Sequence, residues 1–134
     1  MQKIPYIISC LIATVILCQC STVKSVSEEN KDGWISMFNG KDINDWTTKI
    51  HHYEVGDNYG DTFRVEDSII KVRYDQYEGD FNERYGHLYY NTPYSYYHLV
   101  VEYRFVGELH PGAPSYTIKN SGVMFHSQDP RTMP

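Results

Sequence analysis

Apolar residues recur at every second position along much of this chain, and this strand period constrains the fold more than any other feature. One example is "TFRVEDSIIKVRY", residues 62–74. Two alternating runs flank a polar pair: Phe63 and Val65, then Asp67-Ser68, then Ile70 and Val72. Because a polar pair between two alternating runs is typical of a tight turn, residues 62–74 are predicted to form a β-hairpin.

Four further segments have strand character, and no stretch after residue 33 has the spacing and caps of a helix. They are residues 34–38, which precede the turn signal Asn39-Gly40, and residues 86–91, 96–108 and 120–126. In residues 96–108, the apolar Leu99, Val101, Tyr103 and Phe105 share one face. Glu102 and Arg104 lie on the other face. With the 13 tyrosines of the chain, these strands predict an all-β sandwich of the jelly-roll type.

The number of strands predicted from this sequence is small for a sandwich of two packed sheets. Residues 120–126 would form an apolar edge without a neighbour, and such an edge favours aggregation. We therefore expect the sandwich to be truncated, so that this chain carries the N-terminal part of a longer domain.

The first 20 residues have the pattern of an export signal. Lys3 precedes an apolar run from Ile4 to Leu17, which is shorter than the roughly 20 residues of a membrane-spanning helix. The run ends in "LCQC", which resembles a bacterial lipoprotein signal with Cys20 as the lipidated residue. Cys18 is the competing acceptor, and an uncleaved N-terminal anchor is the alternative. We expect residues 21–32 to form a flexible tether, residues 33–134 to form the domain, and the protein to be lipid-anchored in a bacterial cell envelope.

Cysteine usage and charge restrict the function further. All three cysteines lie within residues 1–20, so the exported part contains no disulfide and no thiolate metal site. The net charge of the chain is −5, which argues against nucleic-acid binding.

The segment "NSGVMFH", residues 120–126, is the main candidate for a site. Alternation places Val123 and Phe125 on a core face, and Asn120, Gly122, Met124 and His126 on the opposite face. A glycine between two polar residues lets a substrate approach the backbone closely. The residues alone favour a structural role, in which Asn120 closes a turn and Gly122 marks a bulge.

Histidine and acidic residues supply the remaining candidates. His87 and His126 lie on or beside predicted strands and suit acid–base chemistry near neutral pH. Glu102 lies mid-strand, where pairing with Arg104 or simple exposure is the alternative role. His51-His52 falls in a polar loop and is predicted to be solvated. The six histidines show no recognised metal-ligand spacing, so no cofactor is evident. The sequence does not decide whether a divalent metal takes part in the reaction.

Four motifs in order resemble one known family. "GWISMFNGKDINDW", "FRVEDSIIKV", "YYHLVVEYRF" and "NSGVMFH" are similar to the landmarks of the 3-keto-disaccharide hydrolase domain, formerly a domain of unknown function. The resemblance runs from Gly33 to Pro134. Ser68 stands where relatives have a turn glycine, and His126 where many have arginine. Relatives also continue into a second half that is absent here.

The resemblance implies a concanavalin-like β-sandwich that cleaves glycosides already oxidised at C3 of the sugar. A base would abstract the C2 proton, and the C1 substituent would then be eliminated. The resemblance implies Asn120 and His126 as site-lining residues, with His126 the catalytic candidate and Glu102 a weaker third. We expect Asn120, Glu102 and His87 to bind the substrate. The expected partners of the protein are the oxidised carbohydrate, the membrane through the lipid anchor, and an oxidoreductase that makes the ketone.

Two other functions fit the same residues. Concanavalin-like sandwiches include lectins, so a non-catalytic carbohydrate-binding module is one alternative. An ordinary glycoside hydrolase is the other, and it would need two carboxylates facing each other across a cleft.

Overall fold

The structure is a computed structural model that describes residues 32–134. The predicted export signal, its lipidation residue Cys20 and nearly all of the predicted tether lie outside the described residues. Within residues 32–134, no helix has both the length and the apolar character required to cross a bilayer.

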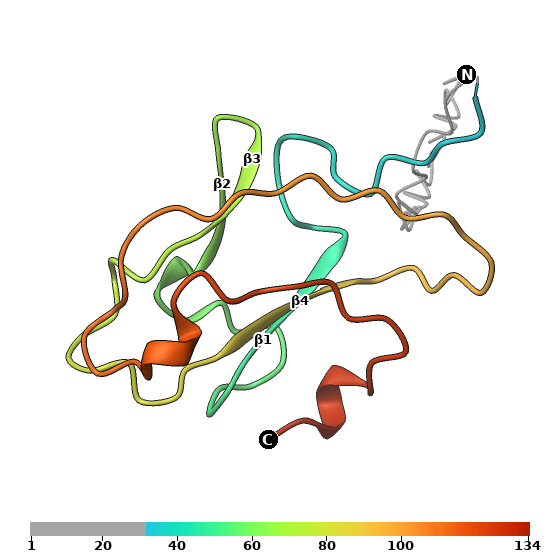
Figure 1. The fold of residues 1–134 in the computed structure, drawn as a ribbon. Helices are drawn as coiled ribbons and strands as arrows, with labels where there is room; N and C mark the ends of the chain where they lie inside the picture. The colour runs from blue at the N-terminus through green and yellow to red at the C-terminus, as the bar shows by residue number, and fades with distance from the viewer. Residues whose placement is uncertain (1–31) are drawn as a thin grey trace, which may run out of the picture.

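Four strands form two separate antiparallel pairs (Figure 1). β1 (Trp46–Ile50) pairs with β4 (Gly86–Tyr90), in a register that places Trp46 opposite Tyr90 and Ile50 opposite Gly86. β2 (Phe63–Glu66) pairs with β3 (Ile69–Val72). Three short 3₁₀ turns, Tyr59–Asp61, Ser115–Thr117 and Pro130–Thr132, complete the regular structure, and residues 32–134 contain no α-helix. The predicted all-β class is therefore confirmed.

The β2–β3 hairpin is formed where the alternation predicted it. Asp67 and Ser68 both have positive φ, at 55° and 57°, as a two-residue type I′ turn requires. Glu66, at the end of β2, accepts hydrogen bonds from Lys71 and Arg73, which lower the pKa of its carboxyl group to about 2. Ion pairs therefore reinforce the turn at its base.

A small aromatic core lies between the two strand pairs and the loops that follow them. Its buried members are Ile50, Phe63, Tyr77 and Phe81, together with Thr62. The backbone of β4 approaches this core so closely that a Cβ added at Gly86 would lie 3.0 Å from the Phe63 ring. Thr62 and Tyr77 share a hydrogen bond of 2.8 Å between their hydroxyl groups. The core thus fixes β4 and the segment that precedes it.

Three of the predicted strands are not formed. Residues 34–38 contribute only an isolated bridge at Ile35, and residues 96–108 and 120–126 are drawn as extended tubes without strand arrows (Figure 1). The residues assigned to their core faces are exposed, with Phe105 at 42% and Phe125 at 68%. Neither long segment is paired with another strand in the described chain. A strand is stabilised by hydrogen bonds and side-chain contacts to a neighbouring strand, so an alternating sequence is not sufficient to form one.

Candidate active site

The strand pair β1–β4 carries a pocket that contains His87. His87 lies opposite Lys49 in the register of the pair, and its side chain is half-buried. The cavity has a volume of about 210 Å³ and is lined by Lys49, His51, Tyr85, His87, Met133 and Pro134. Burial lowers the pKa of His87 below its usual 6.5, because desolvation disfavours the charged imidazolium. His87 is therefore a neutral imidazole at neutral pH and can accept a proton.

A tyrosine in the same pocket has the opposite protonation behaviour. The hydroxyl of Tyr85 lies 2.9 Å from the hydroxyl of Tyr116, which follows a long loop. This hydrogen bond is the largest cause that raises the pKa of Tyr85 to about 12. The phenol therefore keeps its proton at neutral pH and can donate it only to a strongly basic acceptor. The pocket thus combines a proton acceptor with a proton donor.

Lys49 places a positive charge between this pocket and a second one. The second cavity, of about 250 Å³, shares Lys49, Met133 and Pro134 with the first and adds His52, Tyr53, Glu54, Val55 and Arg131. The lysine is only 5% exposed, and its Nζ donates to the carbonyl oxygens of Tyr53, at 2.8 Å, and Ile50, at 3.4 Å. These bonds fix the ammonium group at the junction of the two cavities.

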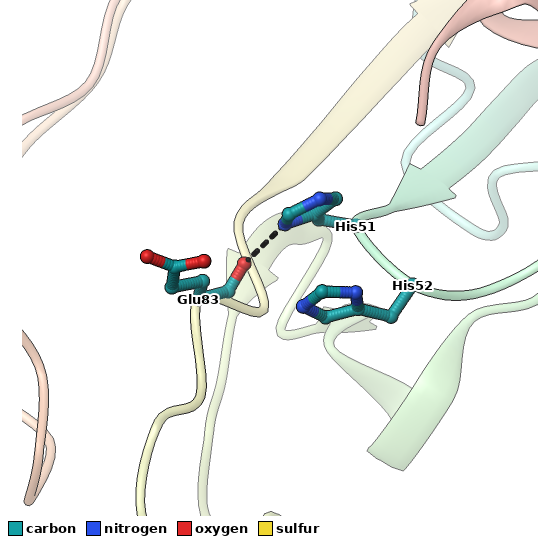
Figure 2. Close-up of side chains that lie close together, drawn as sticks. All are labelled: His51, His52 and Glu83. Carbon is teal, nitrogen blue, oxygen red and sulfur yellow. Dashed lines mark hydrogen bonds between the residues drawn. The ribbon is translucent and has the colours of Figure 1, made fainter.

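His51, His52 and Glu83 meet at the end of β1 (Figure 2). The two imidazole rings are stacked with centroids 3.8 Å apart, and Nδ1 of His51 lies 3.0 Å from the carbonyl oxygen of Glu83. One ring nitrogen of each histidine and a carboxylate oxygen of Glu83 lie within 4.8 Å of one another. His51 is half-buried rather than solvated as predicted, whereas His52 is exposed. This set of side chains has the composition of a metal site.

A family model described as the 3-keto-alpha-glucoside-1,2-lyase-like domain matches residues 33–134. The chain belongs to this family. The resemblance inferred from the four motifs is confirmed over the same residues, and the family is concanavalin-like, in agreement with the all-β structure. No curated protein and no solved structure matches the chain.

In this lyase-like domain, the motif-derived residues lie apart from His87. The Asn120 side chain donates to the carbonyl oxygen of Tyr116 at 3.0 Å, so it closes a turn. His126 is exposed, has a φ of 58°, and contacts the neighbouring Phe125 ring edge-on. Glu102 is exposed as well. None of these three residues lines either of the two cavities.

Sequence reasoning missed most residues around the two cavities of the lyase-like domain. Lys49 and Tyr85 belong to no recognised motif, and the tail residues Met133 and Pro134 are far from β1 in sequence. Two signals were present in the sequence. Trp46, the first residue of β1, closes the first family motif, and residues 86–91 were predicted as a strand. Pairing of these two segments brings Lys49 and His87 together.

Proposed function

We propose that this chain cleaves glycosides whose sugar carries a ketone at C3, as a lyase or hydrolase acting on the C1 bond. The observation that carries the proposal is the match of the 3-keto-alpha-glucoside-1,2-lyase-like domain to residues 33–134.

The ketone permits a route that needs no paired carboxylates. It acidifies the C2 proton, and a base removes that proton to give an enolate. The electron pair then forms the C1–C2 double bond and expels the C1 substituent, whose oxygen takes a proton from an acid. Release at this point completes a lyase reaction, and addition of water, with its hydroxyl at C1 and its proton at C2, completes a hydrolysis. No oxidant or reductant is consumed.

The pocket beside β4 supports one assignment of roles. His87 is the base, because burial keeps its imidazole neutral. Tyr85 is the acid, because its phenol retains its proton, and the Lys49 ammonium favours the negative charge of the enolate. All three side chains line the same cavity. The family resemblance supports a second assignment, with His126 as base and Asn120 and Glu102 as substrate-binding residues.

The decisive assay gives the full-length protein a 3-keto-glucoside and, separately, its unoxidised parent. We expect cleavage of the keto form alone, measured as release of the C1 substituent. Cleavage of the parent alone would replace this proposal with an ordinary glycoside hydrolase, and binding without turnover would replace it with a lectin.

The proposed location is a bacterial cell envelope, with Cys20 carrying the lipid. An oxidoreductase that converts the C3 hydroxyl to a ketone would have to supply the substrate. Metabolic labelling with a clickable fatty acid tests the anchor, with Cys18→Ser as the matched control. Label lost in Cys20→Ser and kept in Cys18→Ser supports the proposal, and the reverse pattern assigns the lipid to Cys18.

A further inference from the structure

We propose that His51, His52 and Glu83 bind one divalent transition-metal ion, with zinc as the ion that probes the site. The inference begins from their placement: donor atoms from all three side chains already lie within 4.8 Å of one another. In a tetrahedral zinc site, bonds of about 2.0–2.1 Å set neighbouring donor atoms about 3.4 Å apart. Closing this difference requires side-chain rotations, for which the exposed His52 and Glu83 have room.

The donor set selects the class of metal. Imidazole nitrogen suits zinc, copper and nickel, whereas magnesium and calcium prefer a shell made of oxygen. Two histidines and one carboxylate are a known zinc set that leaves a position for water. Together they offer one negative charge to a doubly charged ion, so the ion is attracted rather than repelled.

The backbone holds the cluster in place before any ion binds. The amide of His51 donates to the carbonyl oxygen of Tyr85 at 2.9 Å, and Nδ1 of His51 bonds to the carbonyl oxygen of Glu83. Both contacts tie the end of β1 to the segment before β4, and Figure 2 shows the second of them. A carbonyl oxygen can only accept, so His51 carries its proton on Nδ1 in the neutral ring. Coordination through Nε2 keeps this proton where it is, and coordination through Nδ1 moves it to Nε2.

The Glu83 carboxylate is not committed to another cation. No ion pair involves it among residues 32–134, although Arg84 is the next residue. The guanidinium of Arg84 turns inward, where it donates to the carbonyl oxygens of Phe81, Glu78 and Asp80. The carboxylate is therefore available to a ligand from solvent.

The position of the cluster links it to both cavities. His51 lines the cavity that contains His87, and His52 lines the neighbouring one. A bound ion would lie at their shared rim. The inference does not rest on the proposed reaction, because it concerns binding alone.

Isothermal titration of the untagged full-length protein with zinc tests the site. We expect one ion per chain, and at least a roughly tenfold weaker affinity in His51→Ala, His52→Ala and Glu83→Gln, since loss of even an outer-shell partner costs 10–100-fold. His98→Ala and Glu108→Gln are matched controls, because both residues are exposed and should bind zinc as the wild type does.

Imidazole NMR of the wild-type chain gives a second measurement that does not depend on the folding of a variant. Zinc should shift the ring resonances of His51 and His52 and leave those of His98 and His110 in place. Absence of zinc binding, equal affinity in all variants, or an equal effect of His98→Ala would overturn the proposal. So would zinc shifts confined to other histidines.

Discussion

The guanidinium carbon of Arg84 lies 4.3 Å from the centre of the Tyr77 ring and 5.1 Å from that of Tyr59. Arg84 is only 5% exposed, and its nitrogens donate to three backbone carbonyls and to the Tyr59 hydroxyl. One cation therefore holds the loop before β4 against the aromatic core.

Replacement of Arg84 by methionine should destabilise the fold by about 3 kcal/mol, because several buried carbonyl oxygens lose their donor. Arg84→Lys should recover only part of this loss, since one ammonium group cannot reproduce the planar fork of donors. Urea unfolding measures both. Arg104→Met is the control at an exposed site, and an equal loss there would contradict the role assigned to Arg84.

Gly86→Ala should destabilise the fold by about 1–3 kcal/mol, because the added methyl group overpacks the core. Its Cβ would lie 3.0 Å from two atoms of the Phe63 ring and 3.5 Å from Ile50. A Cβ at Gly122 has no atom within 4 Å, which makes Gly122→Ala the matched control in the same thermal melts. The idea is wrong if the two variants melt together.

Ser68→Gly should stabilise the β2–β3 hairpin by up to about 1 kcal/mol. Serine is held there at a φ of 57°, a left-handed conformation that glycine adopts without steric cost. Chemical denaturation gives the difference in unfolding free energy. A decrease in stability would show that the serine side chain makes a contact that outweighs its backbone strain.

Stability should fall as the pH drops below about 6.5. Burial lowers the pKa of His87 in the folded state, so the unfolded chain binds the proton more readily. The stability that is present above the unfolded-state pKa is therefore lost as the pH falls through the folded-state pKa. Glu66 acts only at lower pH, between its ordinary 4.5 and its folded value of about 2. The melting temperature of His87→Gln should depend less on pH between 6.5 and 5 than that of the wild type; parallel curves would contradict this.

The two assignments of the catalytic base make opposite kinetic predictions. With a 3-keto-glucoside, His87→Gln should lower kcat by about 10²–10⁴-fold, and Tyr85→Phe should lower it too, because general acid–base catalysis contributes on that scale. His126→Ala should leave kcat unchanged if the pocket beside β4 is the site. A large loss in His126→Ala with normal turnover in His87→Gln would move the site to the family motif, and His98→Gln is the exposed control.

The parts of the fold that were predicted correctly from sequence are those determined by local signals. The β2–β3 hairpin needs only its own alternation and the Asp67-Ser68 turn, and both are within one short segment. Residues 96–108 alternate more clearly than β2, yet they form no strand, because strand formation also requires a neighbour that alternation cannot supply.

The candidate site was less predictable for the same reason. His51 and His52 are adjacent, but Glu83 is separated from His51 by 32 positions, so no sequence spacing identifies the cluster. His87 was recognised as an acid–base candidate because histidine titrates near neutral pH. Its burial, and the proximity of Tyr85, follow only from the pairing of β1 with β4.

The order of strands in the two pairs has a consequence for folding kinetics. The β2–β3 hairpin closes across two residues, whereas the β1–β4 pair joins segments at opposite ends of a long loop that contains that hairpin. Because closure entropy grows with loop length, the hairpin should form early and the β1–β4 ladder late. The cavity lined by Lys49 and His87 therefore exists only in molecules that have completed the slow step. Amide exchange should show that the hydrogen bonds of the β1–β4 ladder are the first to be lost when the domain opens.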